Sequence, residues 1–180
     1  MKHQLRLISA GALLAAGLPM AAMAQVPVTV SVNVQGSCAV STPVNAAYGN
    51  FTPAAASTNL DWTGSVTLRC NKGATPFVAV SYGSNPSGTQ RRMLNANGDT
   101  LNYAIQKPSL SGANFSSCPA FNAGSAWGDS ASGTGRLDAS GAFSTAGGNS
   151  VISLCVQATM TDVMAQGLWS DVVQVSVALN

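Results

Sequence analysis

Residues 25–34 read QVPVTVSVNV and place a valine at every second position: Val26, Val28, Val30, Val32 and Val34. Side chains of a β-strand point alternately to its two faces, so this spacing puts all five valines on one face. Burial of the valine side chains is worth roughly 7 to 15 kcal/mol before the cost of ordering the chain. The segment therefore predicts an apolar strand that needs a groove, either in its own domain or in another molecule.

The preceding residues 1–24 have the pattern of an export signal. They combine a basic start at residues 2–6, an apolar stretch at residues 7–18 and the small-x-small site Ala22-Met23-Ala24. We expect cleavage after Ala24 and export through the inner membrane. No later segment is apolar and long enough to span a bilayer, so we expect no integral membrane segment after processing.

The charge of the chain limits the classes of partner. The full chain has eight Lys and Arg residues against six Asp and no Glu, and cleavage of the leader removes Lys2 and Arg6. The mature chain is then close to neutral, which argues against a nucleic-acid partner because such a partner needs a clustered basic surface. Low net charge also favours self-association. We expect the one local basic pair, Arg91-Arg92, to lie exposed at a strand end.

Catalytic and metal-binding patterns are scarce. The only histidine is His3 in the leader, so the mature chain lacks Ser-His-Asp and Cys-His arrangements and imidazole metal ligands. Aspartate pairs alone can hydrolyse a glycoside. The aspartates here, however, mostly lie beside Gly, Ser, Asn or Thr, where turn capping is the ordinary role. We expect no enzyme activity, no cofactor and no metal.

Four cysteines remain in the mature chain: Cys38, Cys70, Cys118 and Cys155. An even number of cysteines in an exported chain indicates two disulfides, for which three pairings are possible. We favour Cys38 with Cys70 and Cys118 with Cys155, because the first bridge would staple the first core strand to the next long one. Their spacing does not fit a zinc site.

The rest of the chain consists of short alternating segments between Gly-, Asn-, Ser- and Pro-rich turns. Strands are expected at residues 63–70, 77–82, 101–106 and 151–158, and at the end of the chain, where Val173, Val175, Val177 and Leu179 alternate. Residues 109–150 read as a loop region with one or two short strands. This pattern predicts an all-β sandwich. If the leading strand is donated to another molecule, the sandwich is one strand short.

Several motifs in this order resemble the spore coat protein U domain, the fold of subunits in archaic, Csu-type chaperone-usher pili. They follow the leading strand over nearly the whole mature length: Gly36-Ser37-Cys38, Tyr48-Gly49-Asn50-Phe51, Cys70, Arg91-Arg92-Met93, Leu101-Asn102-Tyr103-Ala104-Ile105, Trp127-Gly128-Asp129 and Gly167-Leu168-Trp169-Ser170-Asp171. The resemblance implies an incomplete immunoglobulin-like sandwich that lacks its last strand. It divides the chain into a signal peptide (1–24), a donor-strand extension (25–36) and a pilin domain (37–180).

The resemblance also implies a function, donor-strand complementation. In that family a periplasmic chaperone lends a strand to the subunit, and an outer-membrane usher exchanges it for the N-terminal extension of the neighbouring pilus subunit, which is β-strand addition. Transferred to this chain, the donor residues are the five alternating valines. The acceptor groove is expected to be lined by Ala39, Val173, Val175, Val177 and Leu179. The expected product is a cell-surface pilus that contributes to adhesion and biofilm formation.

Two alternatives stay open at this point. Residues 26–34 could be the first strand of a complete, monomeric sandwich. The chain could also be a secreted binding module that recognises carbohydrate or a host surface, with an exposed Trp127 or Trp62 stacked on a sugar ring.

Overall fold

The computed structural model describes residues 31–52, 57–129 and 135–180. The predicted signal peptide and the valines Val26, Val28 and Val30 lie outside these residues. From Val34 onward the chain forms one compact unit. Its described regular structure is almost entirely β-strand, with a single 3-10 turn, η1 (Ser140–Ala142), as the helical element in the described part.

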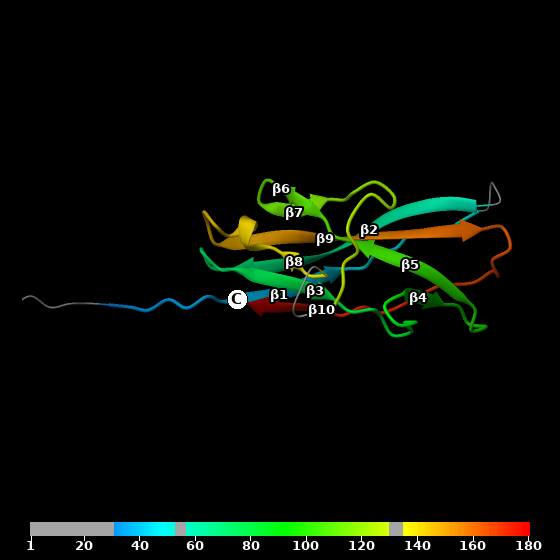
Figure 1. The fold of residues 1–180 in the computed structure, drawn as a ribbon, viewed down its shortest axis with the longest axis horizontal. Coiled ribbons are helices and arrows are strands. Elements are labelled where there is room, and N and C mark those ends of the chain that lie inside the picture. The colour runs from blue at the N-terminus through cyan, green and yellow to red at the C-terminus, as the bar shows by residue number, and fades with distance from the viewer. Residues whose placement is uncertain (1–30, 53–56, 130–134) are drawn as a thin grey trace, which may run out of the picture. The chain divides into compact units, whose positions relative to one another are not determined.

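The larger of two sheets is built around two long, antiparallel central strands. Its strand order is β1-β2-β9-β5-β4, with β6 and β7 attached beside β9 (Figure 1). The strands are β1 (Cys38–Val44), β2 (Ser57–Cys70), β4 (Arg91–Leu94), β5 (Thr100–Gln106), β6 (Ser109–Ser111), β7 (Asn114–Ser117) and β9 (Gly148–Thr161). Strands β2 and β9 pair without interruption from Ser57 opposite Thr161 to Cys70 opposite Gly148.

The smaller sheet has the order β10-β3-β8. Its strands are β3 (Pro76–Val80), β8 (Leu137–Asp138) and β10 (Val175–Leu179). Both pairs of neighbours are antiparallel, and β10 is aligned along the whole of β3. The last strand of the chain is therefore a border strand of this sheet.

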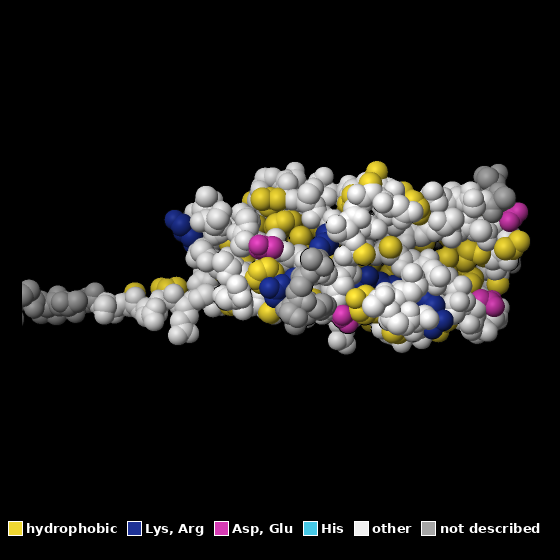
Figure 2. Space-filling view, viewed as in Figure 1, with side chains coloured by type: hydrophobic (Ala, Val, Ile, Leu, Met, Phe, Trp, Pro, Cys, Tyr) yellow, Lys and Arg dark blue, Asp and Glu magenta, His cyan; other side chains and the backbone are white. Residues whose placement is uncertain are grey.

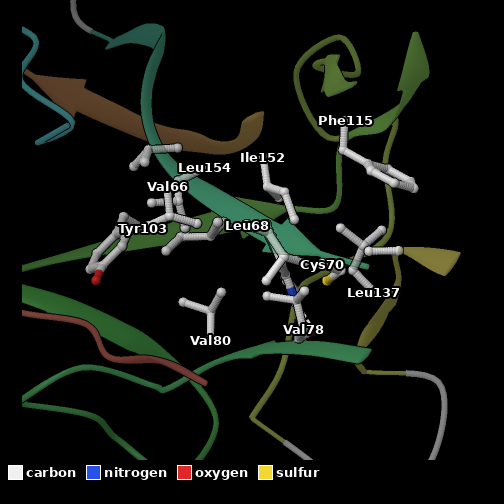
Figure 3. Packing of buried hydrophobic residues seen from close by; sticks show 14 of the residues in the cluster. Val66, Leu68, Cys70, Val78, Val80, Tyr103, Phe115, Leu137, Ile152 and Leu154 are labelled. Atoms are coloured by element: carbon white, nitrogen blue, oxygen red, sulfur yellow. Dashed lines mark hydrogen bonds between the residues drawn. The ribbon is translucent and has the colours of Figure 1, made fainter. Parts of the chain in front are cut away.

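The core lies between the two sheets. Alternate residues of β2, including Val66 and Leu68, are buried, as expected for a strand with one face inward. They face Val78 and Val80 of β3, and Ile152 of β9 packs beside them (Figure 3). Burial of these large aliphatic side chains from both sheets is the main term that holds the sandwich together.

The all-β sandwich predicted from the alternating segments is confirmed. The expected strands at 63–70, 77–82, 101–106 and 151–158 correspond to β2, β3, β5 and β9. The region 109–150 holds more structure than predicted, with β6, β7, β8 and η1 among its described residues. The prediction for Arg91 is wrong: it begins β4 and is only 4% exposed, because its guanidinium reaches into the interior.

Candidate functional site

Two border strands, one from each sheet, lie side by side without pairing. Strand β1 pairs with β2 and β10 pairs with β3, and in the described part of the chain no strand pairs with the other edge of either. Cα atoms of β1 and β10 nevertheless come within 8 Å of each other (Figure 1). Backbone N–H and C=O groups along such edges need partners, and an added strand supplies them.

We call the side on which β1 and β10 adjoin without pairing the β1/β10 groove, and the side chains along it are mostly apolar. Val173, Val175 and Val177 are half-buried and pack against the core, and Leu179 at the end of β10 is 43% exposed. On the other side Cys38 packs against the core and Val40 is 41% exposed. An apolar strand laid here would cover valine and leucine side chains that now contact water.

Ala39 lies on the face of β1 opposite to Cys38. It is exposed and adjoins Cys38, whose side chain points to the core, and successive residues of a strand alternate in direction. Val40 shares the face of Cys38, since it pairs with the buried Leu68 of β2. The four predicted residues of the last segment share one face of the chain: Val173, Val175, Val177 and Leu179.

Two disulfides secure the larger sheet. Cys38 and Cys70 are directly opposite each other on β1 and β2, with Cα atoms 4.2 Å apart. Cys118 and Cys155 link the segment after β7 to β9, with Cα atoms 5.6 Å apart. These are the pairings favoured from the sequence. The first bridge links the border strand β1 to β2, the neighbour with which β1 pairs.

The leading segment leaves the sandwich beside the start of β1. Its described residues 31–37 form no strand, and the side chain of Val34 is 72% exposed. Asn71, in the turn after β2, holds the chain here with three hydrogen bonds. Its Nδ2 donates to the carbonyl of Gln35 at 2.8 Å and its Oδ1 accepts from the amide of Ser37 at 2.8 Å. Its own amide donates to the carbonyl of Ser37 at 3.2 Å. We call this arrangement the Asn71 bracket.

A buried polar cluster fixes the approach to β10. Arg91 donates from Nε to the carbonyl of Ser81 at 2.8 Å and from Nη2 to that of Val80 at 2.7 Å. The Tyr103 hydroxyl donates to Asp171 Oδ2 at 2.7 Å, and Asp171 Oδ1 accepts from the amide of Ser84 at 2.8 Å. The cluster thus ties β4 and β5 of the larger sheet to the end of β3 and to the segment that leads into β10.

Burial shifts the pKa values of this cluster. Removal from water disfavours the charged forms of both side chains, so burial lowers the pKa of Arg91 and raises that of Tyr103 well above its usual range. The hydrogen bond from Tyr103 to Asp171 raises the tyrosine pKa further. Sequence reasoning missed this cluster, because the carbonyl partners of Arg91 are identified only once β3 and β4 are placed together.

The two tryptophans that could stack on a sugar ring are at least half-buried. Trp127 is fully buried and donates its indole N–H to the carbonyl of Val78 at 2.9 Å, so it offers no platform for a sugar. Trp62 is half-buried, with Tyr48 edge-on to it at 5.9 Å between ring centroids. In the described residues, no three His, Cys, Asp or Glu side chains gather as metal ligands do. A search for membrane-spanning helices in that same part of the chain finds none.

These features define a β-sandwich with two unpaired border strands, β1 and β10, along one side. A model of the spore coat protein U domain matches residues 24–176. The chain belongs to this family. A search of curated proteins finds no match.

Two solved structures are similar to this chain. One is described as the CsuC-CsuE chaperone-tip adhesion subunit pre-assembly complex from archaic chaperone-usher Csu pili of Acinetobacter baumannii. It is 20% identical with a TM-score of 0.43, and the match covers 80% of this chain and 40% of that one. The other is described as a chaperone-tip adhesin complex in CFA/I fimbriae biogenesis. It is 10% identical with a TM-score of 0.41, and covers 76% of this chain and 38% of that one. The chain spans about two fifths of the length of each.

Proposed function

We propose that this protein is a structural subunit of an extracellular chaperone-usher pilus and polymerises by donor-strand exchange. The observation that carries the proposal is the apolar β1/β10 groove, whose two edges belong to different sheets and have no partner strand in the described residues. A strand that enters it would bond to β10 along one edge and cover the half-buried valines beneath. The role is structural, with no catalytic step.

The leading segment has the properties that such a groove requires. At about 3.3 Å per residue, residues 26–34 span roughly 30 Å as a strand. Strand β10 spans Val175–Leu179, and Gln174 before it extends the pairing to Ser81 after β3. The alternating valines would point into the groove while Thr29, Ser31 and Asn33 face outward. The segment cannot fill a neighbour's groove and its own at once.

The proposed partners are a periplasmic chaperone, an outer-membrane usher and neighbouring pilus subunits. The chaperone would lend a strand to the groove in the periplasm, and the usher would exchange that strand for residues 26–34 of the following subunit. The resulting cell-surface fibre would contribute to adhesion and biofilm formation. A chaperone appears in the descriptions of both similar structures, and chaperone-usher pili appear in that of the first.

Deletion of residues 25–35 tests the proposal. The shortened chain, expressed behind an intact export signal together with chaperone and usher, should still be recovered bound to the chaperone but should form no fibre. Full-length chain is the control. The proposal fails if the full-length mature chain purifies as a stable monomer in which residues 26–34 are protected from hydrogen exchange, and the deletion unfolds it.

A further inference from the structure

The sandwich has two ends that carry different side chains. The first end holds the start of β1 and the turn Asn71-Lys72-Gly73, because Cys38 pairs with Cys70. Strand β10 also finishes there, since Leu179 pairs with Pro76. The second end holds the loop after β9, because β9 finishes where Thr161 pairs with Ser57. Figure 2 shows a basic side chain projecting near the C-terminus and acidic and apolar side chains at the opposite end.

The loop at the second end exposes large apolar side chains. Val163 is 87% exposed and Leu168 is 81% exposed, and Asp162 beside them is exposed as well. At the first end Lys72 is exposed on its turn. A lysine can lay its methylene stem on apolar side chains and still place its ammonium group near a carboxylate. The lysine at the first end therefore matches the second end in charge, through Asp162, and in apolar contact, through Val163 and Leu168.

Strand directions determine which ends would meet in a fibre. Strand β10 runs toward the first end. A donor strand antiparallel to β10, the more stable arrangement per residue, runs toward the second end and leaves the groove there. The domain that follows this donor strand is then held at the second end of the acceptor. Such a head-to-tail contact repeats without closing and builds a filament.

The connection between donor strand and domain is short. The Cα atoms of Val34 and Cys38 can be at most about 14 Å apart, since an extended chain covers about 3.5 Å per residue. The Asn71 bracket holds Gln35 and Ser37 against the turn that also carries Lys72. A donor strand bound in the neighbouring groove therefore brings this turn close to the loop at the neighbour's second end.

We infer that in the fibre Val163 and Leu168 of one subunit are covered by the turn Asn71-Lys72-Gly73 of the following subunit, with Lys72 facing Asp162. This inference rests on the proposed function, because it requires the donor strand to occupy a neighbour's groove. It adds a second contact between subunits, outside the groove, which sets how successive domains are oriented.

Photo-crosslinking within assembled fibres tests this contact. A photoreactive phenylalanine in place of Leu168 in the full chain should give subunit ladders, and peptide mapping should place the adduct near Lys72 of a second copy. The same probe at Leu110, an exposed leucine of β6, is the matched control and should give no adduct at that turn. Lys72→Gln should lower the crosslink yield roughly 1.5- to 5-fold, the value of an exposed ion pair. The double change Lys72→Asp with Asp162→Lys should restore it.

The outcomes separate the two proposals. Fibres that form normally but give no adduct from position 168, or one that maps away from residues 71–73, overturn the end-to-end contact and leave donor-strand exchange standing. A wild-type chain that forms no fibres with its chaperone and usher overturns both.

Discussion

The hydroxyl of Tyr103 donates to a carboxylate oxygen of Asp171 at 2.7 Å, and this bond joins β5 of the larger sheet to the segment that leads into β10. Tyr103 is only 5% exposed, so little of its side chain reaches water. Because β10 forms one edge of the groove, the pair helps to hold that edge in place.

Tyr103→Phe removes this hydrogen bond and little else. We expect the free energy of unfolding to fall by about 1.5 to 3 kcal/mol, the usual value for a bond to a charged group. Urea unfolding of identically prepared wild type and variant measures the change. Tyr48→Phe, at an exposed tyrosine, is the control and should leave the unfolding midpoint within experimental error.

The raised pKa of Tyr103 predicts a loss of stability in alkali. The unfolded chain releases the tyrosine proton near pH 10, whereas the folded chain keeps it to higher pH because burial and Asp171 oppose ionisation. The unfolded state then binds fewer protons than the folded state, so stability is fully present below pH 10 and falls as the pH rises further. The fall should be shallower in Tyr103→Phe. Equal slopes for the two proteins would contradict the prediction.

Arg91 and Arg92 are neighbours with different roles. Arg91→Met leaves the carbonyl oxygens of Val80 and Ser81 without their donor in a buried site, and we expect a loss of about 2 to 4 kcal/mol in unfolding free energy. Arg92 is partly exposed and donates to the carbonyls of Asn85 and Pro86. Arg92→Met should therefore cost less than about 1 kcal/mol. Similar losses in the two variants would mean that burial of Arg91 is unimportant.

The bridge between Cys38 and Cys70 holds the border strand β1. Replacement of both cysteines by serine should lower the free energy of unfolding by about 3 to 4 kcal/mol, given the sequence separation of 32 residues. Hydrogen exchange should accelerate most in β1, because its other edge has no strand partner among the described residues. Loss of the bridge between Cys118 and Cys155 should instead leave exchange in β1 almost unchanged.

The donor face of the leading segment can be tested one residue at a time. Synthetic peptides of residues 25–35 should displace the chaperone from the groove. Val30→Asp should lower the affinity of the peptide for the groove by roughly 100-fold or more, because it removes the burial of one valine and buries a charge instead. Ser31→Asp, on the opposite face, should change it little. If both peptides weaken equally, the proposed facing of the valines is wrong.

The alternating segments explain why so much of the sandwich could be predicted. In β2 and β10 a single apolar face gives a period of two that the sequence displays directly. In β4 the signal is hidden, because Arg91 reads as a surface residue until the carbonyl groups at the end of β3 are placed beside it. The same holds for Asn71, which reads as a turn residue but also holds the start of the chain.

The predicted lining of the acceptor groove stays a prediction. The residues of the last segment share one face, whereas Ala39 lies on the face of β1 opposite Cys38. From Val173 to Leu179 the alternation of apolar and polar residues itself shows which side chains face the core. Strand β1 has only Val40 and Val44 as large apolar residues, and its register shifts between Ser41 and Val44, so the phase is set by the disulfide partner of Cys38. Spacing alone could not distinguish Ala39 from Val40.

The Asn71 bracket has a mechanical consequence. When a donor strand is pulled along its length, all the hydrogen bonds of its ladder share the force. The Asn71 bracket, in contrast, consists of three hydrogen bonds at one exposed point. Under tension the joint between domains would open before the strand is withdrawn. A filament of such subunits would stretch reversibly at its joints and keep its subunits in line.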